Sequence, residues 1–189
     1  NQSPRYRYGV NLSARWNGIG LSVFLQGVGA RDWYPGSDAG MFWGKYGRPF
    51  FALIPSIHNY TDDMYSAERN NWDTAYWPRM TTYQSNGTKN WTRLLEIPNT
   101  RYIQSAAYLR VKNIQLDYSF PKHICSAIRL QGLKIYVNAE NLFTFTPLHK
   151  YAPNFDPEGL SYDSDFASAA DGYTYPILKS VTVGVNITF

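Results

Sequence analysis

The sequence has few of the residues that build metal centres and catalytic sites. It contains a single cysteine, Cys125, which excludes an internal disulfide and any cysteine-based zinc site. Its three histidines, His58, His123 and His149, are scattered along the 189 residues without metal-ligand spacing. The sequence also shows no Ser–His–Asp order, no catalytic pair of carboxylates and no glycine-rich phosphate loop. We therefore expect a protein that is not an enzyme and needs no cofactor.

Long apolar runs and blocks of one charge are also missing. No apolar run approaches the roughly 18 residues that a membrane helix needs. The net charge is +4, but the lysines and arginines are scattered, so nothing predicts nucleic-acid binding. Strands of a membrane β-barrel are about 10 residues long with one apolar face, and they leave the mean hydropathy low. The negative mean hydropathy therefore does not exclude the membrane.

Alternation of polar and apolar residues predicts five β-strands, and therefore an all-β chain. The first two strands flank Asn17-Gly18, a strong signal for a two-residue hairpin turn. The register of the third strand is unclear in its upper half, because Arg110 and Lys112 fall among its apolar positions. The expected strands are residues 5–16, 19–28, 106–120, 132–141 and 178–189, all with approximate ends.

The connections between these strands alternate between short and long. Short connections are expected at residues 17–18 and about 121–131, and long ones at about 29–105 and 142–177. Tight periplasmic turns and long external loops are typical of an outer-membrane barrel. Aromatic residues at the strand ends favour the same interpretation, since aromatics collect at membrane–water interfaces. These residues are Tyr6, Tyr8, Trp16, Tyr118, Phe120 and Phe189.

Two further inferences concern the sheet as a whole. Five strands cannot close a barrel in lipid, because an open edge leaves backbone groups unsatisfied. We therefore expect the chain to be a fragment of a longer one, or to need other copies. A soluble carbohydrate-binding β-sandwich stays open as an alternative, since its inner faces are also apolar and alternating.

Several blocks of sequence together resemble the C-terminal end of a SusC/RagA-type TonB-dependent transporter of Bacteroidetes. They occur in the order and spacing typical of that family and cover almost the whole chain. A shorter segment, WDTAYWPRM, resembles the part of the family that precedes the third strand. The blocks are GVNLSARWNGIGLSVFLQGVGARDWY, TRYIQSAAYLRVKNIQLDYSFP, LKIYVNAENLFTFTPLHKYAPNFDPE and YPILKSVTVGVNITF.

This resemblance implies a fold and a function. It implies a plugged barrel of about 22 strands, a class that closes around a filled lumen. It implies uptake of oligosaccharides or peptides across the outer membrane, with a SusD-like surface lipoprotein as a lid and energy from TonB. The plug domain and the TonB box would precede residue 1. A C-terminal aromatic strand also resembles the signal read by the barrel-assembly machinery, which assigns that role to Phe189.

Aromatic and charged residues of the first long connection are candidate contacts for the substrate or the lid protein. Aromatic faces give large contact areas that suit sugar rings and peptide side chains. The same rings can pack the loop on itself, which we favour for most of them because so long a loop needs a small core. The candidates are Arg31, Asp32, Trp33, Tyr34, Phe42, Trp43, Tyr46, Trp72, Tyr76, Trp77 and Arg79.

Two other features lead to weaker expectations. The acidic stretch NFDPEGLSYDSD offers oxygen ligands that calcium prefers, but it lacks the EF-hand spacing, and a solvated external loop is favoured. Gly184 lies on the polar face of the last strand, where it leaves room for the plug or marks a bend. The calcium candidates are Asp156, Glu158, Asp163 and Asp165.

Overall fold

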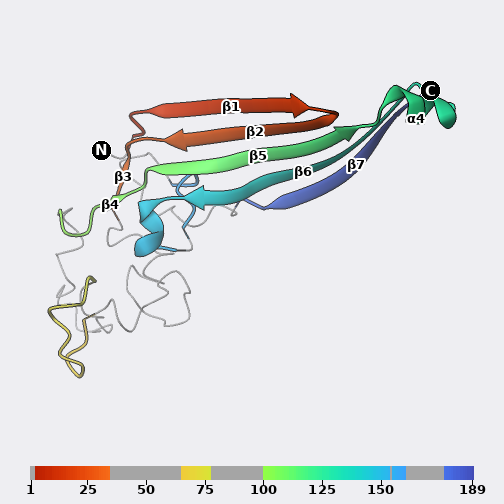
Figure 1. Cartoon of the computed structure of the whole chain (residues 1–189). Helices are drawn as coiled ribbons and strands as arrows, with labels where there is room; N and C mark the ends of the chain where they lie inside the picture. The colour runs from red at the N-terminus through yellow and green to blue at the C-terminus, as the bar shows by residue number, and fades with distance from the viewer. Residues whose placement is uncertain (1–2, 35–64, 78–99, 154, 161–176) are drawn as a thin grey trace. The chain divides into compact units, whose positions relative to one another are not determined.

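The computed structural model describes residues 3–34, 65–77, 100–153, 155–160 and 177–189, which belong to two compact units. The first, the sheet unit, comprises Arg5–Gly29, Tyr108–Phe145 and Ile177–Phe189. The second, the loop unit, comprises Asn1–Pro4, Ala30–Ala107 and Thr146–Pro176. The strands of the sheet unit run side by side as long arrows (Figure 1).

The sheet unit is one antiparallel sheet of five strands in the order β1-β2-β5-β6-β7. The all-β class and the five-stranded antiparallel sheet expected from the sequence are therefore confirmed. One strand differs from its expected extent by more than two residues, since the fourth continues to residue 145 rather than ending at 141. The strands are β1 (Arg7–Trp16), β2 (Ile19–Val28), β5 (Tyr108–Ser119), β6 (Gly132–Phe145) and β7 (Ser180–Thr188).

A β-bulge at Lys112 explains why the register of the third strand is unclear from sequence. Phe24 of β2 pairs with Asn113, and the next residue, Leu25, pairs with Val111. Lys112 is therefore an extra residue between two paired positions. Because strand side chains alternate, one extra residue places all residues before it in β5 on the faces opposite to those that strict alternation predicts.

The bulge places the polar residues of the upper half of β5 on the polar face and the apolar residues on the apolar face. Arg110 pairs with Gln26 on one side and with Thr144 on the other, so it lies on the polar face. The irregularity continues into β6, where Asn141 has a positive φ of 53° and lies between paired positions. An asparagine tolerates this left-handed conformation better than most residues do. The break in alternation at Asn141 hides the last four residues of β6 from a pattern search.

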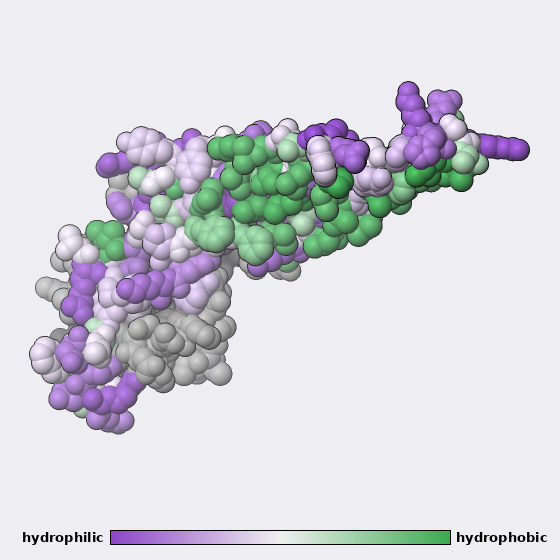
Figure 2. Space-filling model, viewed as in Figure 1, coloured by the Kyte–Doolittle hydropathy of each residue, from purple (hydrophilic) through white to green (hydrophobic). Residues whose placement is uncertain are grey.

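The corrected register gives the sheet one unbroken apolar face. Three cross-strand rows on this face contain apolar residues from all five strands, as in Leu12, Val23, Ile114, Ala139 and Val181. The face appears as a continuous green area over the strands (Figure 2). A soluble protein rarely exposes so large an apolar patch, so this face is suited to lipid or to a partner.

The opposite face is polar. A row next to the one above reads Ser13, Ser22, Gln115, Asn138 and Thr182. Small hydroxyl and amide side chains of this kind suit a water-filled or protein-filled barrel interior.

One end of the sheet carries the short connections and the C-terminus. Asn17 and Gly18 join β1 to β2 with positive φ values of 48° and 87°, as a two-residue hairpin requires. The helix α4 (Lys122–Ala127) joins β5 to β6 at the same end (Figure 1). Within the described residues, no helix is long and apolar enough to cross a membrane.

The loop unit has a small core of its own. Strand β3 (Asp32–Trp33) pairs antiparallel with β4 (Gln104–Ser105), and the 3-10 helix η1 (Pro147–Lys150) contributes Leu148 to the core. The buried cluster contains Trp33, Tyr34, Trp77, Tyr102, Ala106, Leu148, Ala152, Phe155 and Leu160.

Candidate functional site

A buried carboxylate organises the polar face of the sheet unit. The side chain of Asp117 is 4% exposed, and its Oδ2 lies 3.0 Å from Nη2 of Arg15. Nζ of Lys134 lies 3.5 Å from Oδ1 of the same carboxylate, and Nη1 of Arg15 also donates to Oγ of Ser119 at 3.3 Å. Two cations and one anion leave this cluster with one excess positive charge.

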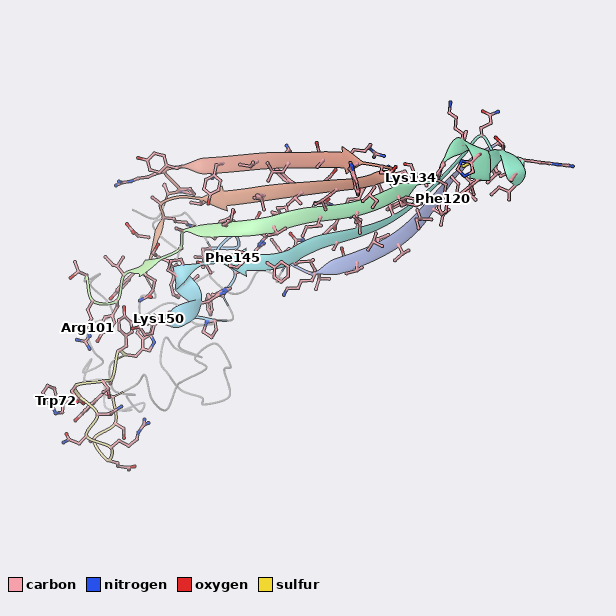
Figure 3. All side chains as sticks on the ribbon, viewed as in Figure 1. Trp72, Arg101, Phe120, Lys134, Phe145 and Lys150 are labelled. Carbon is pink, nitrogen blue, oxygen red and sulfur yellow. The ribbon has the colours of Figure 1, made fainter. Side chains whose placement is uncertain are left out.

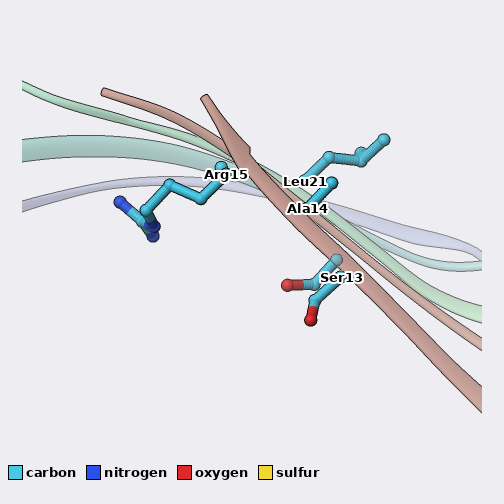
Figure 4. Close-up of a pocket in the computed structure, with 6 residues that line it drawn as sticks. Ser13, Ala14, Arg15 and Leu21 are labelled. Atoms are coloured by element: carbon cyan, nitrogen blue, oxygen red, sulfur yellow. The ribbon is translucent and has the colours of Figure 1, made fainter. Parts of the chain in front are cut away.

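A depression beside this cluster exposes polar groups of the hairpin. It is open, has a volume of about 260 Å³ and is lined by Ser13, Arg15, Gly20 and Ser22, among others. Figure 4 shows Ser13 and Arg15 on one side of the strand, with Ala14 and Leu21 on the other. A Cβ at Gly20 would lie 2.7 Å from Oδ1 of Asp117, so the missing side chain makes room for the carboxylate.

Other polar-face residues are also held by neighbouring strands. The guanidinium of Arg110 is buried, and its Nε donates to Oγ1 of Thr144 at 2.9 Å. Oγ of Ser180 donates to Oε2 of Glu140 at 3.1 Å. These contacts give the face a fixed pattern of charge rather than a set of mobile side chains.

The space over Gly184 is filled by Tyr136, its cross-strand partner. A Cβ at Gly184 would lie 2.3 Å from Cζ of Tyr136, which is far closer than van der Waals contact. This glycine therefore accommodates a tyrosine ring of the sheet itself, which neither of the expectations from the sequence included.

Three of the aromatic candidate contact residues are buried in the loop unit. Trp33, Tyr34 and Trp77 are 3%, 7% and 1% exposed, and all three belong to the buried cluster. The ring of Trp33 packs against Phe155 at a centroid distance of 5.4 Å, and that of Trp77 stacks on Tyr102 at 5.6 Å. Burial raises the pKa of Tyr34 to about 12, with a smaller contribution from Tyr102. These rings pack the loop unit.

Arg31 joins two segments that are distant in the sequence. Its guanidinium is buried, and it donates from Nη1 to the carbonyl of Pro157 at 2.8 Å and from Nη2 to that of Leu160 at 2.7 Å. The neighbouring candidate Asp32 is exposed. Arg31 thus fixes the segment 157–160 against the start of β3.

Tyr76 and Trp72 are the more accessible aromatic candidates. Tyr76 stacks on Tyr151 at a centroid distance of 3.8 Å and accepts a hydrogen bond from Gln104. Burial raises the pKa of Tyr76, and the bond from Gln104 opposes that rise. Trp72 is 71% exposed, and Figure 3 shows its side chain projecting outward from the side of its segment. Its neighbour Asn71 holds that segment by accepting a bond from the backbone N–H of Ser66 at 2.9 Å.

The remaining candidates divide between described and undescribed residues. Asp156 forms a local turn, in which its Oδ1 accepts from the backbone N–H of Glu158 at 2.9 Å. Across the parts of the chain that the structure describes, no group of three or more His, Cys, Asp or Glu side chains could hold a metal ion. Six candidates lie outside the described residues: Phe42, Trp43, Tyr46, Arg79, Asp163 and Asp165.

Two sets of residues were missed by the sequence analysis. Phe143 and Phe145 lie on the apolar face at the end opposite the short turns, with ring centroids 6.5 Å apart. They are aromatic residues at a strand end, and the bulge at Asn141 concealed them. The cluster around Asp117 was missed because only the register brings its members together.

Comparison with known proteins gives a consistent result. No protein-family model matches the chain. TonB-dependent receptors P3 and P26 of Formosa agariphila are 31% and 26% identical to it over 96 residues. These alignments cover 48% and 49% of the chain but only 9% of each relative, so the chain corresponds to a small part of their length.

Similarity in structure extends over the whole chain. The RagAB peptide importer in its open-open state matches with a TM-score of 0.60 and 17% identity, covering 100% of this chain and 17% of the other. Its closed-closed state matches with a TM-score of 0.58 and 19% identity, covering 99% and 17%. These matches establish the similarity of the fold.

A sheet with one apolar face, one polar face and aromatic strand ends, whose fold matches part of the RagAB importer, has the features expected of a segment of an outer-membrane β-barrel. The relatives take this further: over about half of its length the chain is similar in sequence to TonB-dependent receptors, in agreement with its resemblance to SusC/RagA-type transporters. The protein is located in the bacterial outer membrane. The alternative of a soluble sandwich receives no support from these comparisons.

Proposed function

We propose that the full-length protein imports a nutrient across the outer membrane as a SusC-like transporter. The observation that carries this proposal is the unbroken apolar face, which the bulge at Lys112 preserves while it keeps Arg110 on the polar face. A sheet that segregates its faces in this way suits a wall between lipid and an aqueous or protein-filled interior. The curated relatives and the solved structures support the same activity.

The proposed architecture assigns this chain to the last five strands of a barrel of about 22 strands, a size class that encloses a plugged lumen. The short turns and the C-terminus lie on the periplasmic side, and the long connections, residues 29–105 and 142–177, lie outside the cell. The plug domain and the TonB box belong to the part of the protein that precedes residue 1. Phe189, at the end of the last strand, serves as the barrel-assembly signal.

The proposed partners are TonB, which supplies energy through the plug, and a SusD-like surface lipoprotein, which covers the external loops. The substrate is an oligosaccharide or a peptide. A peptide importer is among the structures of similar fold, whereas the exposed ring of Trp72 suits either class of substrate. We propose no catalytic role for any residue, and the substrate is not modified during passage.

An uptake experiment tests this function. Cells that lack the full-length protein are compared with complemented cells for uptake of labelled oligosaccharide and peptide mixtures. We expect one class of label to enter complemented cells only, and to stop entering when TonB is removed as well. Equal uptake with and without the protein, or release of cleaved products by the purified protein, would contradict the proposal.

Purified full-length protein then separates binding from transport. Calorimetric titration with the class of substrate that entered the cells should give saturable binding. The variant Trp72→Ala should weaken that binding if its ring contacts the substrate. The variant Trp77→Ala is not a suitable comparison, because Trp77 is buried and its loss disturbs the loop unit.

A further inference from the structure

The connection around α4, here called the α4 turn (residues 121–131), is a fixed structure rather than a loose loop. The side chain of Cys125 is 1% exposed, and its Sγ lies 3.8 Å from the carbonyl oxygen of Phe120. The backbone N–H of Gln131 donates to the carbonyl of Thr188 in β7 at 2.9 Å. The α4 turn is therefore attached to the end of the sheet from both β5 and β7.

An arginine occupies a position of this turn where glycine is preferred. The N–H of Leu130 donates to the carbonyl of Cys125 at 2.9 Å, and that of Arg129 donates to the carbonyl of Ser126 at 3.1 Å. This pair of bonds ends a helix with its next residue in the left-handed region, which glycine adopts without crowding of a Cβ. Arg129 has a φ of 60° here. A side chain that is kept at a backbone position unfavourable to it suggests a function for that side chain.

The exposed surface of the α4 turn is basic and apolar. Lys122 and Arg129 are exposed, and the turn contains no acidic residue. Neither side chain has an ion-pair partner among the described residues. Ile124 and Ile128 are 40% and 54% exposed, and their spacing of four residues places them on the same side of the helical turn. Basic residues beside exposed isoleucines are typical of segments that lie in a membrane interface.

The position of the α4 turn in the sheet unit also agrees with a location in a membrane interface. The turn follows Tyr118 and Phe120, whose ring centroids are 4.9 Å apart. Tyr118 lies in the same cross-strand row of the apolar face as Trp16. Aromatic residues of this kind mark the level of the lipid headgroups. Figure 3 shows side chains of α4 projecting beyond the labelled Phe120 at this end of the sheet.

We propose that the α4 turn binds the headgroup of an anionic phospholipid, with Lys122 and Arg129 at the phosphate and Ile124 and Ile128 among the upper acyl carbons. The assignment of this lipid to the periplasmic leaflet rests on the topology given under the proposed function. Two observations point to lipid rather than to a soluble anion: the apolar pair beside the charges, and the position of the turn directly after the aromatic pair Tyr118 and Phe120 at the end of the apolar face.

Native mass spectrometry of the full-length protein in detergent tests the proposal. The protein is titrated with phosphatidylglycerol and, separately, with phosphatidylethanolamine. We expect tighter binding of phosphatidylglycerol, and about a fivefold loss of that preference for each basic residue removed, by Lys122→Gln or Arg129→Gly. Arg129→Gly is the decisive variant, because it removes the charge while it relaxes the backbone, so a loss of binding is not explained by misfolding.

Control variants separate the possible outcomes. Lys179→Gln removes an exposed lysine at the other end of the sheet unit and should leave the preference unchanged. An unchanged preference in Arg129→Gly, or an equal loss in Lys179→Gln, overturns the proposal. Full competition by soluble glycerol phosphate, or an unchanged affinity in Ile124→Ser/Ile128→Ser, overturns the assignment to lipid. Nutrient uptake is measured separately, so its failure would refute the transporter function without affecting this result.

Discussion

Exchange of Arg110 and Val111 in the sequence is the most direct test of the register of β5. Lys112 is the extra residue of the bulge in β5, and it places Val111 opposite Leu25 on the apolar face and Arg110 opposite Gln26 on the polar face. The double variant Arg110→Val/Val111→Arg keeps the bulge and moves the arginine from the polar face to the apolar, lipid-facing side.

The cost of that transfer follows from two contributions. An arginine on the lipid face of a barrel costs about 2–4 kcal/mol at the midplane and about 0–1 near the interfaces, so an intermediate depth gives about 1–3 kcal/mol. Arg110 also loses its bond to Thr144, and hydrogen bonds to charged groups contribute about 1.5–3 kcal/mol. We expect the exchange to destabilise the full-length protein by about 3–5 kcal/mol.

The assay uses the full-length protein in cells. The amount in the outer-membrane fraction and the heat-modifiable migration on gels report assembly, and thermal unfolding in detergent reports stability. Lys112→Ala is the matched control, because it keeps Arg110 and Val111 on their faces and should behave like the wild type. An exchange variant that assembles and unfolds like the wild type, or better, would show that the bulge does not set the faces of β5.

Four further predictions concern single residues of the full-length protein. Asp117→Ala should lower the unfolding temperature more than Asp117→Asn, because the amide keeps an oxygen for the neighbouring cations while alanine leaves them facing each other; equal effects would count against the cluster. Gly27→Ala should destabilise by about 1–3 kcal/mol in thermal unfolding, since its Cβ would lie 2.3 Å from a backbone carbonyl oxygen, whereas Gly132→Ala meets ordinary contacts at 3.6 Å and should be tolerated. The raised pKa of Tyr34 favours its neutral form in the folded state, so its contribution to the free energy of unfolding is complete below pH 10 and is lost as the pH rises towards about 12. Replacement of Tyr34 by phenylalanine should therefore make the free energy of unfolding depend less on pH between pH 10 and about 12, and an unchanged dependence would contradict the assignment. Deletion of Phe189 should lower the amount of protein in the outer membrane without changing ligand affinity, and normal assembly of the truncated protein would refute that role.

The sheet could be predicted from the sequence wherever the alternation is intact. The β1–β2 hairpin follows from Asn17-Gly18 and two regular strands, and both strands have the expected inner and outer residues. The upper half of β5 and the end of β6 could not be predicted. Bulges at Lys112 and beside Asn141 change which face a residue lies on, and their positions depend on pairing between strands rather than on local pattern.

The candidate site was less predictable than the fold, for two reasons. Asp117 and Arg15 are 102 residues apart in the chain, so only the completed register brings them together. In the loop unit, the sequence shows which residues are aromatic but not which are buried. Trp72 is 71% exposed and Trp77 is 1% exposed, although both occur in one short segment. Burial is a property of the packed unit, and the amino-acid type alone does not determine it.

The glycines of the sheet show how an isolated residue can mislead when its cross-strand partner is ignored. From the sequence, Gly184 is interpreted as room for the plug or as a bend. In the structure, the ring of Tyr136 occupies the space that a side chain at position 184 would take on the polar face. On the apolar face Gly27 is related in the same way to its partner Tyr8, whose ring would lie 2.5 Å from an added Cβ. A large ring that lies over a glycine on the next strand covers the backbone that the glycine leaves open. The same arrangement on both faces indicates that these glycines are packing positions of the sheet, at which a ring from the neighbouring strand fills the space that a side chain would take.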